Sequence, residues 1–158
     1  MVIVRPFRES DAGALAALFH ASVRDAGHRD YTSAQVEAWS PGSPDPAVYL
    51  ARARDRVVLV AETEGGEVVG YGDLGMDGHI DHLYRHPDHV GTGIGSAIYR
   101  ALEAQAMSAN IGTLRVEASE AARRLFLGHG FRVDGRNDFV LRGVPIHNYR
   151  MSKVLAFR

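Results

Sequence analysis

The segment HPDHVGTGIGS, at residues 86–96, decides how we interpret the rest of this sequence. It lies between an apolar run at residues 79–84 and an amphipathic run at residues 94–108, which predict a strand and a helix. In a strand–loop–helix unit, backbone N–H groups of the loop and of the helix N-terminus point toward one anion. Three alternate glycines in the loop have no Cβ that would keep a phosphate away from these N–H groups. They are Gly91, Gly93 and Gly95. The segment therefore predicts a loop that binds pyrophosphate.

Two better-known phosphate-binding loops do not fit this spacing. Counted from Gly91, the last position of the dinucleotide-binding pattern G-x-G-x-x-G falls on Ser96. Counted from Gly93, it falls on Ile98. A Walker loop ends in Gly-Lys-Ser/Thr, and this segment contains no lysine. The remaining alternative is a strand-to-helix turn whose glycines serve only tight packing.

The longer segment around these glycines favours a cofactor site, because residues 83–96 resemble the acetyl-CoA-binding motif of the GNAT N-acetyltransferase superfamily. The usual form of that motif is Arg/Gln-Gly-x-Gly-x-Gly/Ala, and the three glycines match it. Val90 departs from it, since the family usually has Arg or Gln there. The resemblance implies that the cofactor is contacted by Leu83, Tyr84, Arg85, Val90, Gly91, Thr92, Gly93, Ile94, Gly95 and Ser96.

A second match lies about thirty residues further on, at residues 118–131, ASEAARRLFLGHGF. It is similar to the fourth-helix signature of the same family, with Ser119 at the usual Asn position and Phe126 at the usual Tyr position. The resemblance implies that both residues contact the cofactor. It extends over essentially the whole chain, and residues 142–151, RGVPIHNYRM, look like the YafP-like branch of the family.

Hydrophobic periodicity and turn residues predict one α/β domain over residues 1–158. Strands are expected at residues 2–6, 57–63, 68–74, 79–84, 114–117, 131–141 and 145–154. Helices are expected after an N-cap at Ser10, after a Thr32–Gln35 capping box, and at residues 45–53, 94–108 and 119–128. Mixed strands between helices predict a GNAT-like, largely antiparallel central sheet with helices on both faces.

Composition narrows the classes of partner. The net charge of −1 provides no overall field for nucleic acid or anionic lipid, so we expect small-molecule partners. The absence of cysteine excludes disulfides and a cysteine acyl-enzyme, which favours direct transfer between two bound substrates. No run reaches the ~20 apolar residues of a membrane span, and the start does not resemble a signal peptide. We expect a cytoplasmic monomer or homodimer.

Proton transfer is the first chemical requirement of acetylation, because an amine is mostly protonated at pH 7. On a strand over residues 79–84, His79 and Asp81 would share one face, and either side chain could accept the proton. The family commonly supplies the base from this strand. Asp77 is a further candidate at the preceding turn.

The acceptor site is expected near the early helices, which line the acceptor pocket in the resembled family. Tyr31 and Trp39 are the aromatic candidates there, and Asp73 and Tyr149 complete the expected set. Phe126 cannot protonate the departing thiolate as the family's tyrosine does. We therefore expect the thiolate to leave unassisted, with Tyr84, Tyr149 and Ser119 as alternative donors.

The sequence thus predicts an acetyl-CoA-dependent N-acetyltransferase that acts on a primary amine of a small or amino-acid-like acceptor without a metal. One alternative is a non-catalytic acyl-CoA sensor, which would bind the cofactor but release no thiol. The other is a metal-dependent hydrolase built on four histidines, which would contain stoichiometric metal. These are His79, His82, His86 and His89.

Overall fold

The computed structural model describes residues 1–89 and 92–155, and it contains eight strands and five α-helices in this part of the chain. The strands are β1 (Val2–Pro6), β2 (Arg56–Thr63), β3 (Val68–Gly75), β4 (His79–Ile80), β5 (Leu83–Arg85), β6 (Thr113–Ala118), β7 (Arg132–Leu141) and β8 (Val144–Val154). The helices are α1 (Ala12–Ala26), α2 (Ser33–Trp39), α3 (Ala47–Asp55), α4 (Ile94–Ser108) and α5 (Glu120–Gly128). The predicted order of strands and helices is confirmed, with one exception at residues 79–84.

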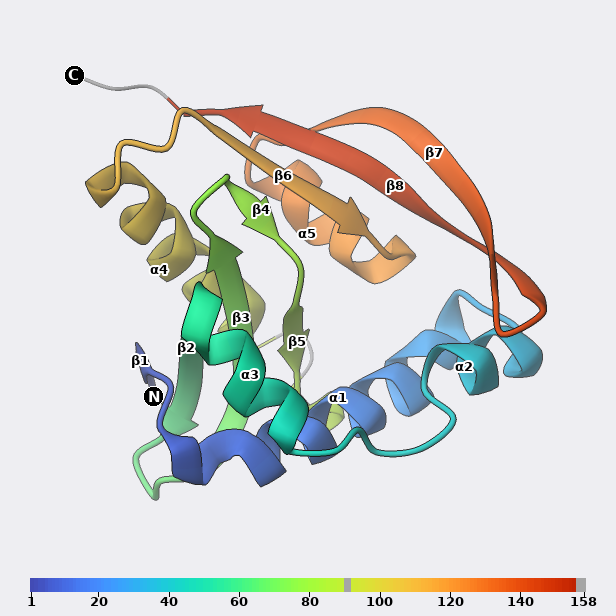
Figure 1. The fold of residues 1–158 in the computed structure, drawn as a ribbon, viewed down its shortest axis with the longest axis horizontal. Helices are drawn as coiled ribbons and strands as arrows, with labels where there is room; N and C mark the ends of the chain where they lie inside the picture. The colour runs from blue at the N-terminus through green and yellow to red at the C-terminus, as the bar shows by residue number, and fades with distance from the viewer. Residues whose placement is uncertain (90–91, 156–158) are drawn as a thin grey trace.

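The strands form two four-stranded sheets (Figure 1). The first has the order β1-β2-β3-β5 and is antiparallel throughout. The second has the order β4-β6-β8-β7, with β4 parallel to β6 and the other pairs antiparallel. The predicted class, mixed and largely antiparallel, is confirmed. The expected central sheet, however, is divided between β4 and β5.

The single strand predicted at residues 79–84 is wrong, because the backbone changes sheets at Asp81 and His82. Their N–H groups donate to Oδ1 of Asp73 at 2.9 and 3.1 Å instead of joining a strand ladder. Asp73 is only 1% exposed, so its carboxylate satisfies two buried amides at the point of separation. The alternation argument that placed His79 and Asp81 on one strand face therefore does not apply.

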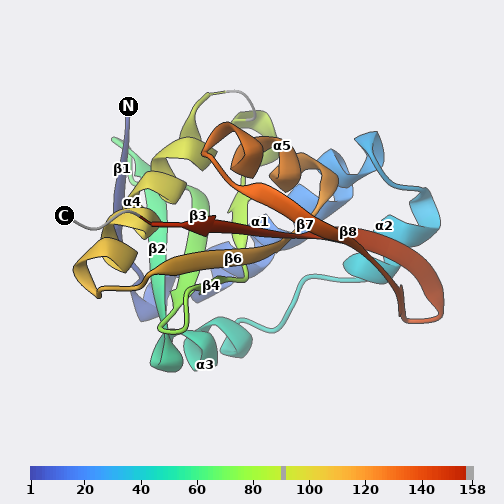
Figure 2. The ribbon, with the colours of Figure 1, turned by 90° about the horizontal axis from the view of Figure 1, so that it is seen from above.

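Helices cover the sheets from opposite sides, and Figure 2 shows α4 and α5 on one side of β6 and β8 with α3 on the other. The approach of α4 to β3 depends on two glycines. A Cβ at Gly70 would lie 2.7 Å from Ile98, and a Cβ at Gly72 would lie 2.8 Å from the same side chain. The absence of these Cβ atoms lets α4 lie directly against the β3 backbone.

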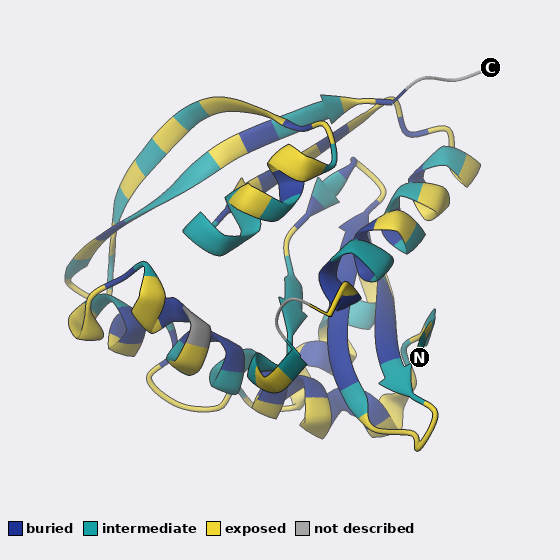
Figure 3. Cartoon of the chain, turned by 180° about the vertical axis from the view of Figure 1, so that it is seen from behind, coloured by how far each residue is buried: buried dark blue, intermediate teal, exposed yellow. Residues whose placement is uncertain are grey.

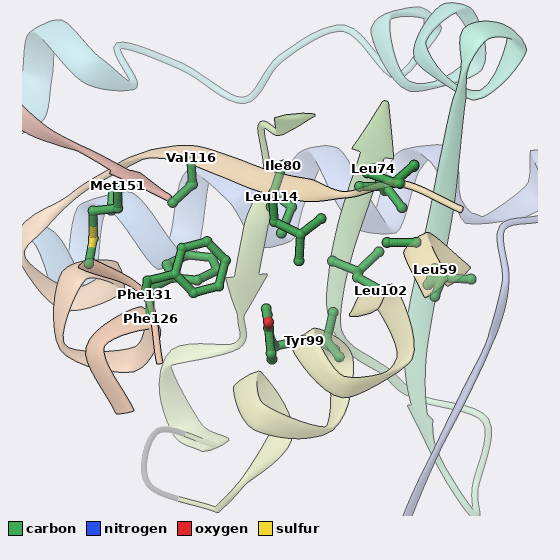
Figure 4. Packing of buried hydrophobic residues seen from close by; sticks show 14 of the residues in the cluster. Leu59, Leu74, Ile80, Tyr99, Leu102, Leu114, Val116, Phe126, Phe131 and Met151 are labelled. Atoms are coloured by element: carbon green, nitrogen blue, oxygen red, sulfur yellow. The ribbon is translucent and has the colours of Figure 1, made fainter. Parts of the chain in front are cut away.

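One apolar core joins the two sheets across the point of separation (Figure 4). Leu59 and Leu74 come from the first sheet, Leu114 and Met151 from the second, and Leu102 comes from α4. Figure 3 shows β2 and β3 as mostly buried, whereas exposed segments recur along β7. Because the core is continuous, the separated strands are held in fixed positions.

Of the two N-terminal helix starts predicted from capping residues, one is wrong and one is confirmed. The N-cap expected at Ser10 is wrong, because Glu9–Asp11 forms a 3-10 turn and α1 begins at Ala12. Asp11 dominates this turn, since its carboxylate accepts the Arg8 N–H and two bonds from Arg5. The Thr32–Gln35 capping box is confirmed by both of its hydrogen bonds.

None of the helices described is long and apolar enough to cross a membrane.

Candidate active site

A cavity of about 410 Å³ lies where the two sheets separate, with β5 on one side and β6 on the other. Of the predicted site residues, it is lined by Tyr31, Trp39, His79, Asp81, Leu83, Tyr84, Ser119 and Phe126. It also brings in residues that the sequence did not single out for catalysis or acceptor binding, chiefly His82, Glu117, Phe139, Leu141, Ile146 and His147. The divided strand therefore opens this cavity between the two sheets.

His79 enters this cavity at the start of the separation and is paired with Glu117 of β6. His79 Nε2 and Glu117 Oε2 are 2.6 Å apart. Parallel pairing of β4 with β6 produces this contact, because it sets His79 opposite Arg115, two residues before Glu117. An imidazole held by a carboxylate is the usual arrangement of a general base and its orienting group. Glu117 was missed because its partner strand lies 38 residues away in the sequence.

Asp81 also reaches the cavity, but its carboxylate is engaged by Arg52 of α3 at 2.7 Å. Arg52 bridges Asp81 to Asp73 behind the cavity wall. Burial raises the pKa of the Asp81 carboxyl, but the hydrogen bond and charge of Arg52, together with the neighbouring imidazoles, outweigh it, so the pKa lies below its ordinary value. A carboxylate with a lowered pKa is a weaker proton acceptor and a better partner for a cation.

His82, the next residue, is packed against aromatic rings. Its Nδ1 lies 2.9 Å from the hydroxyl of Tyr71, which in turn lies 2.8 Å from the hydroxyl of Tyr49. Its ring is stacked on Phe19 with centroids 5.4 Å apart. Burial lowers the pKa of His82 to about 4, so the imidazole is neutral at pH 7. From the sequence, only the position of His82 next to Asp81 in the predicted strand could have indicated that it lines this site.

The far end of the cavity is closed by α2 and the β7–β8 hairpin, which meet in Figure 1. Gln35 donates to the carbonyl of Pro145 at 3.0 Å, and the Tyr31 hydroxyl donates to the carbonyl of His147 at 3.2 Å. Tyr31 and Trp39 pack edge to face, with centroids 5.6 Å apart. The predicted acceptor aromatics thus form one wall of a closed, largely apolar end.

Tyr149 lies beside this end but does not line the cavity. Its hydroxyl donates to Glu120 at 3.0 Å, and the Arg123 guanidinium lies 4.6 Å from its ring centroid. Glu120 Oε2 also lies 2.6 Å from Nε2 of His147, which does line the cavity. Tyr149 therefore supports the wall through Glu120.

Among the predicted catalytic and acceptor residues, Asp73 and Asp77 also do not line the cavity. Asp73 is buried behind it, where Arg52 and Arg56 occupy the carboxylate oxygens. Asp77 is exposed and is paired with Arg115 at 2.5 Å. The placement of Asp73 follows from its burial, and that of Asp77 from its position in the turn between β3 and β4, facing solvent.

The predicted cofactor loop is described from Thr92 onward, and Val90 and Gly91 lie outside the described residues. Gly93 is the N-cap of α4 with φ of 83°, and among the described residues other than its chain neighbours no atom lies within 4 Å of a Cβ built there. A left-handed residue with open space in front of a helix N-terminus leaves the first helical N–H groups accessible to an anion. Ile94 is buried, Thr92 donates to the His89 carbonyl, and Ser96 lies 2.9 Å from His129 Nε2.

Arg85 adds positive charge beside this helix end. Its Nη1 lies 3.3 Å from the position of a Cβ on Gly95, in the first turn of α4. Within the described residues, its buried Nε has no hydrogen-bond partner. Burial lowers the pKa of Arg85, and the charges of Arg29 and Arg124 lower it further. The Arg85 guanidinium beside a helix N-terminus with open space fits a ligand that carries phosphates.

The four histidines considered as metal ligands are held apart in the structure. His79 is paired with Glu117 and His82 with Tyr71, whereas the rings of His86 and His89 pack edge to face 5.8 Å apart. In the part of the chain described, no three His, Asp or Glu side chains are grouped as metal ligands.

Comparison with known proteins identifies the class. The family model described as "Acetyltransferase (GNAT) domain" matches residues 28–153. A GCN5-related N-acetyltransferase from Rhodopseudomonas palustris, also described as a class-II aminotransferase, is 36% identical over 97% of this chain and 95% of its own, with a TM-score of 0.88. A ribosomal-protein-alanine N-acetyltransferase from Brucella melitensis is 27% identical over 97% and 99%, with a TM-score of 0.76.

A third structure shares the fold at lower identity. It is yncA of Salmonella typhimurium, a putative acetyltransferase solved with acetyl-CoA, which is 24% identical over 100% of this chain and 96% of its own, with a TM-score of 0.75. A search of curated proteins found no significant match. The fold and the cavity define an acetyltransferase domain. On the family match and the 36% identity, the chain belongs to the GNAT acetyltransferase family.

Proposed function

We propose that the chain transfers the acetyl group of acetyl-CoA directly to the nitrogen of a small primary amine. The observation that carries the proposal is the cavity, because it joins the predicted cofactor contacts of β5 and α5 to the His79–Glu117 pair. Acetyl-CoA as the donor also agrees with the family and with the acetyl-CoA bound by the Salmonella protein. The open space that the described residues leave before α4, and the Arg85 Nε, which has no hydrogen-bond partner among them, fit its phosphates.

In this mechanism the protein provides positions and a proton acceptor. Acetyl-CoA supplies a thioester carbonyl that a neutral amine can attack, so that an N–C bond forms and the C–S bond breaks. His79 accepts the proton that the bound ammonium group loses before attack, and Glu117 orients the imidazole and stabilises its protonated form. The second proton, which the nitrogen loses as the amide forms, passes to solvent. Asp81, with its lowered pKa, attracts the incoming ammonium group instead of acting as the base.

Departure of the thiolate proceeds without a protein acid in our proposal. Phe126 occupies the position of the family's tyrosine and is buried against Tyr99 and Phe131, so it offers no proton. Burial raises the pKa of Tyr84, which makes its hydroxyl a weaker acid. Tyr149 donates its hydroxyl proton to Glu120. A thiolate is stable enough to leave as an anion.

We also propose that residues 1–158 act as one acetyltransferase domain, which is supported by structural neighbours that cover 97% or more of the chain. Placement in the YafP-like branch rests on residues 142–151 alone. Cytoplasmic location and a monomeric or homodimeric state stay predictions from the sequence.

Thiol release from acetyl-CoA, measured against a panel of amines, amino acids and aminoglycosides, tests the proposed function. We expect at least one amine to raise thiol release well above hydrolysis and to gain an acetyl group by mass spectrometry. Calorimetric binding of acetyl-CoA without thiol release from any amine would identify a sensor instead. Stoichiometric metal in the purified protein, with hydrolytic activity that a chelator abolishes, would favour the hydrolase.

A further inference from the structure

The acceptor end of the cavity has an apolar wall that fits a flat or branched hydrocarbon group. Phe19, Trp39, Phe139 and Leu141 pack together with the buried Ile146 in one cluster. These side chains come from α1, α2 and both strands of the terminal hairpin, so the wall is made by elements that enclose the site. Ligand pockets of this composition obtain affinity from burying apolar area and orientation from a few polar groups.

Apart from three histidines, the charged side chains that line the cavity are of one sign, and two of these histidines, His79 and His147, are paired with Glu117 and Glu120. Asp81 and Glu117 line it, whereas no lysine or arginine does so among residues 1–89 and 92–155. Arg52 is bonded to Asp81 but does not itself line the cavity, and it is also held by Asp73. His82 is neutral at pH 7, because burial lowers its pKa to about 4. The carboxylates of Asp81 and Glu117 can therefore attract a positively charged ligand group, whereas a negatively charged ligand group would find no unpaired cation among the lining residues that the structure describes.

Backbone N–H groups at the start of α5 could also receive an anion, but two of them are already engaged. The Ser119 hydroxyl accepts from the Ala122 N–H at 3.3 Å. The Tyr31 hydroxyl accepts from the Glu120 N–H at 3.1 Å. The Glu120 side chain adds a negative charge to the same turn. This helix end therefore does not substitute for a cation.

We propose that the acceptor is an aromatic or branched apolar amine that carries no carboxylate, and that α-amino acids are excluded. The inference rests on the proposed function, since it concerns the acceptor of the same reaction. An α-amino acid would place its carboxylate in an apolar pocket beside Asp81 and Glu117, with its hydration lost and no opposite charge to replace it. Of the small amines and amino-acid-like acceptors that the sequence left open, this proposal keeps only amines without a carboxylate.

Three ligands of similar shape test this exclusion: 2-phenylethylamine, phenylalaninamide and phenylalanine. Trp39 is the only tryptophan of the chain and lines the cavity, so its fluorescence reports binding to the CoA-loaded protein. We expect 2-phenylethylamine and phenylalaninamide to bind with similar affinity, and phenylalanine to bind at least about 10²-fold more weakly because its charge is repelled and unpaired. The amide controls for the size of the added group.

Variants assign the discrimination to the carboxylates. Asp81→Asn should bring the amine-to-amino-acid ratio below about tenfold, because it removes one repelling charge and leaves Arg52 paired with Asp73 alone, so that its guanidinium can also attract an anion. Glu117→Gln serves as a second test in case Asp81→Asn does not fold. Asp134→Asn, which alters an exposed pair with Arg132 outside the cavity, should leave the ratio unchanged.

Binding and turnover separate the two proposals. Comparable affinity for phenylalanine and 2-phenylethylamine would overturn the exclusion, and so would the absence of a fluorescence change with all three ligands. Tight binding of 2-phenylethylamine without thiol release from acetyl-CoA would leave the ligand class intact and contradict the proposed transfer.

Discussion

Asp73 Oδ1 accepts the backbone N–H of Asp81 at 2.9 Å, and this bond lies at the point where the two sheets separate. The same oxygen accepts the next N–H, that of His82, at 3.1 Å. Arg52 and Arg56 pair with the carboxylate and neutralise its charge in the interior. A buried side chain thus supplies the hydrogen bonds that neither sheet provides, and it keeps the cavity open.

Loss of this carboxylate should destabilise the protein strongly. Asp73→Ala leaves two amides and two guanidinium groups without their buried partner, and we expect a loss of about 3–5 kcal/mol in the free energy of unfolding. Asp73→Asn keeps one oxygen for the two amides and should lose less. Urea unfolding followed by circular dichroism measures both. Asp134→Ala, at an exposed ion pair, should change stability by less than about 1 kcal/mol. An Asp73→Ala variant as stable as the parent would show that the separation does not depend on Asp73.

The buried imidazole of His82 should make stability depend on pH. Burial lowers its pKa from 6.5 to about 4, so the unfolded chain takes up a proton first as the pH falls. Stability is therefore lost between about pH 6.5 and pH 4, by about 3 kcal/mol from this group. His82→Gln should show a flatter dependence over this range, whatever its stability at pH 7. The exposed His28→Gln variant controls for a His-to-Gln substitution outside the cavity. Equal slopes in His82→Gln and the parent would contradict the assignment.

The sequence predicted most helices and strands because they depend on local patterns. Residues 94–108 show a helical stripe, and Thr32 with Gln35 forms a capping box, and both appear where expected. The division of the predicted strand at residues 79–84 depends on Asp73, which binds Asp81 and His82 from a different strand. The alternation of apolar and polar residues within 79–84 therefore could not reveal that the strand is divided.

The parts of the candidate site that lie within one contiguous stretch of sequence were predicted, and the parts that depend on contacts between distant strands were not. The glycine loop and the α5 signature are contiguous motifs, so their resemblance to the GNAT family was visible. The His79–Glu117 pair joins strands that are adjacent only after β4 aligns parallel with β6. The apolar acceptor wall requires the hairpin to fold over α2, which its own sequence does not specify.

Cofactor affinity should depend on the left-handed conformation of Gly93. Valine at φ of 83° is strained, and its side chain would enter the open space in front of α4. We expect Gly93→Val to weaken acetyl-CoA binding by at least ~2 kcal/mol, about thirtyfold, in calorimetry. Gly13→Val, in open space on α1 with ordinary helical geometry, controls for the added side chain. Binding like the parent in a folded Gly93→Val protein would make the loop structural only.

Arg85 should compensate in part for the missing Arg or Gln at position 90. Its guanidinium lies against the first turn of α4, so Arg85→Met should raise the acetyl-CoA dissociation constant about tenfold. Acetyl-pantetheine has no pyrophosphate, so its weaker binding should be unaffected by the variant. Arg54→Met, at an exposed position of α3, is the matched control. Equal losses for both donors would indicate a packing effect and not a phosphate contact.

The central claim, that this cavity transfers an acetyl group with His79 as the proton acceptor, is tested most directly by the pH–rate profile of acetyl transfer to 2-phenylethylamine. We predict that His79→Ala lowers kcat by about 10²–10⁴-fold and removes the acidic limb of the profile, while acetyl-CoA binds as in the parent. A His79→Ala enzyme with the rate and profile of the parent would contradict the claim.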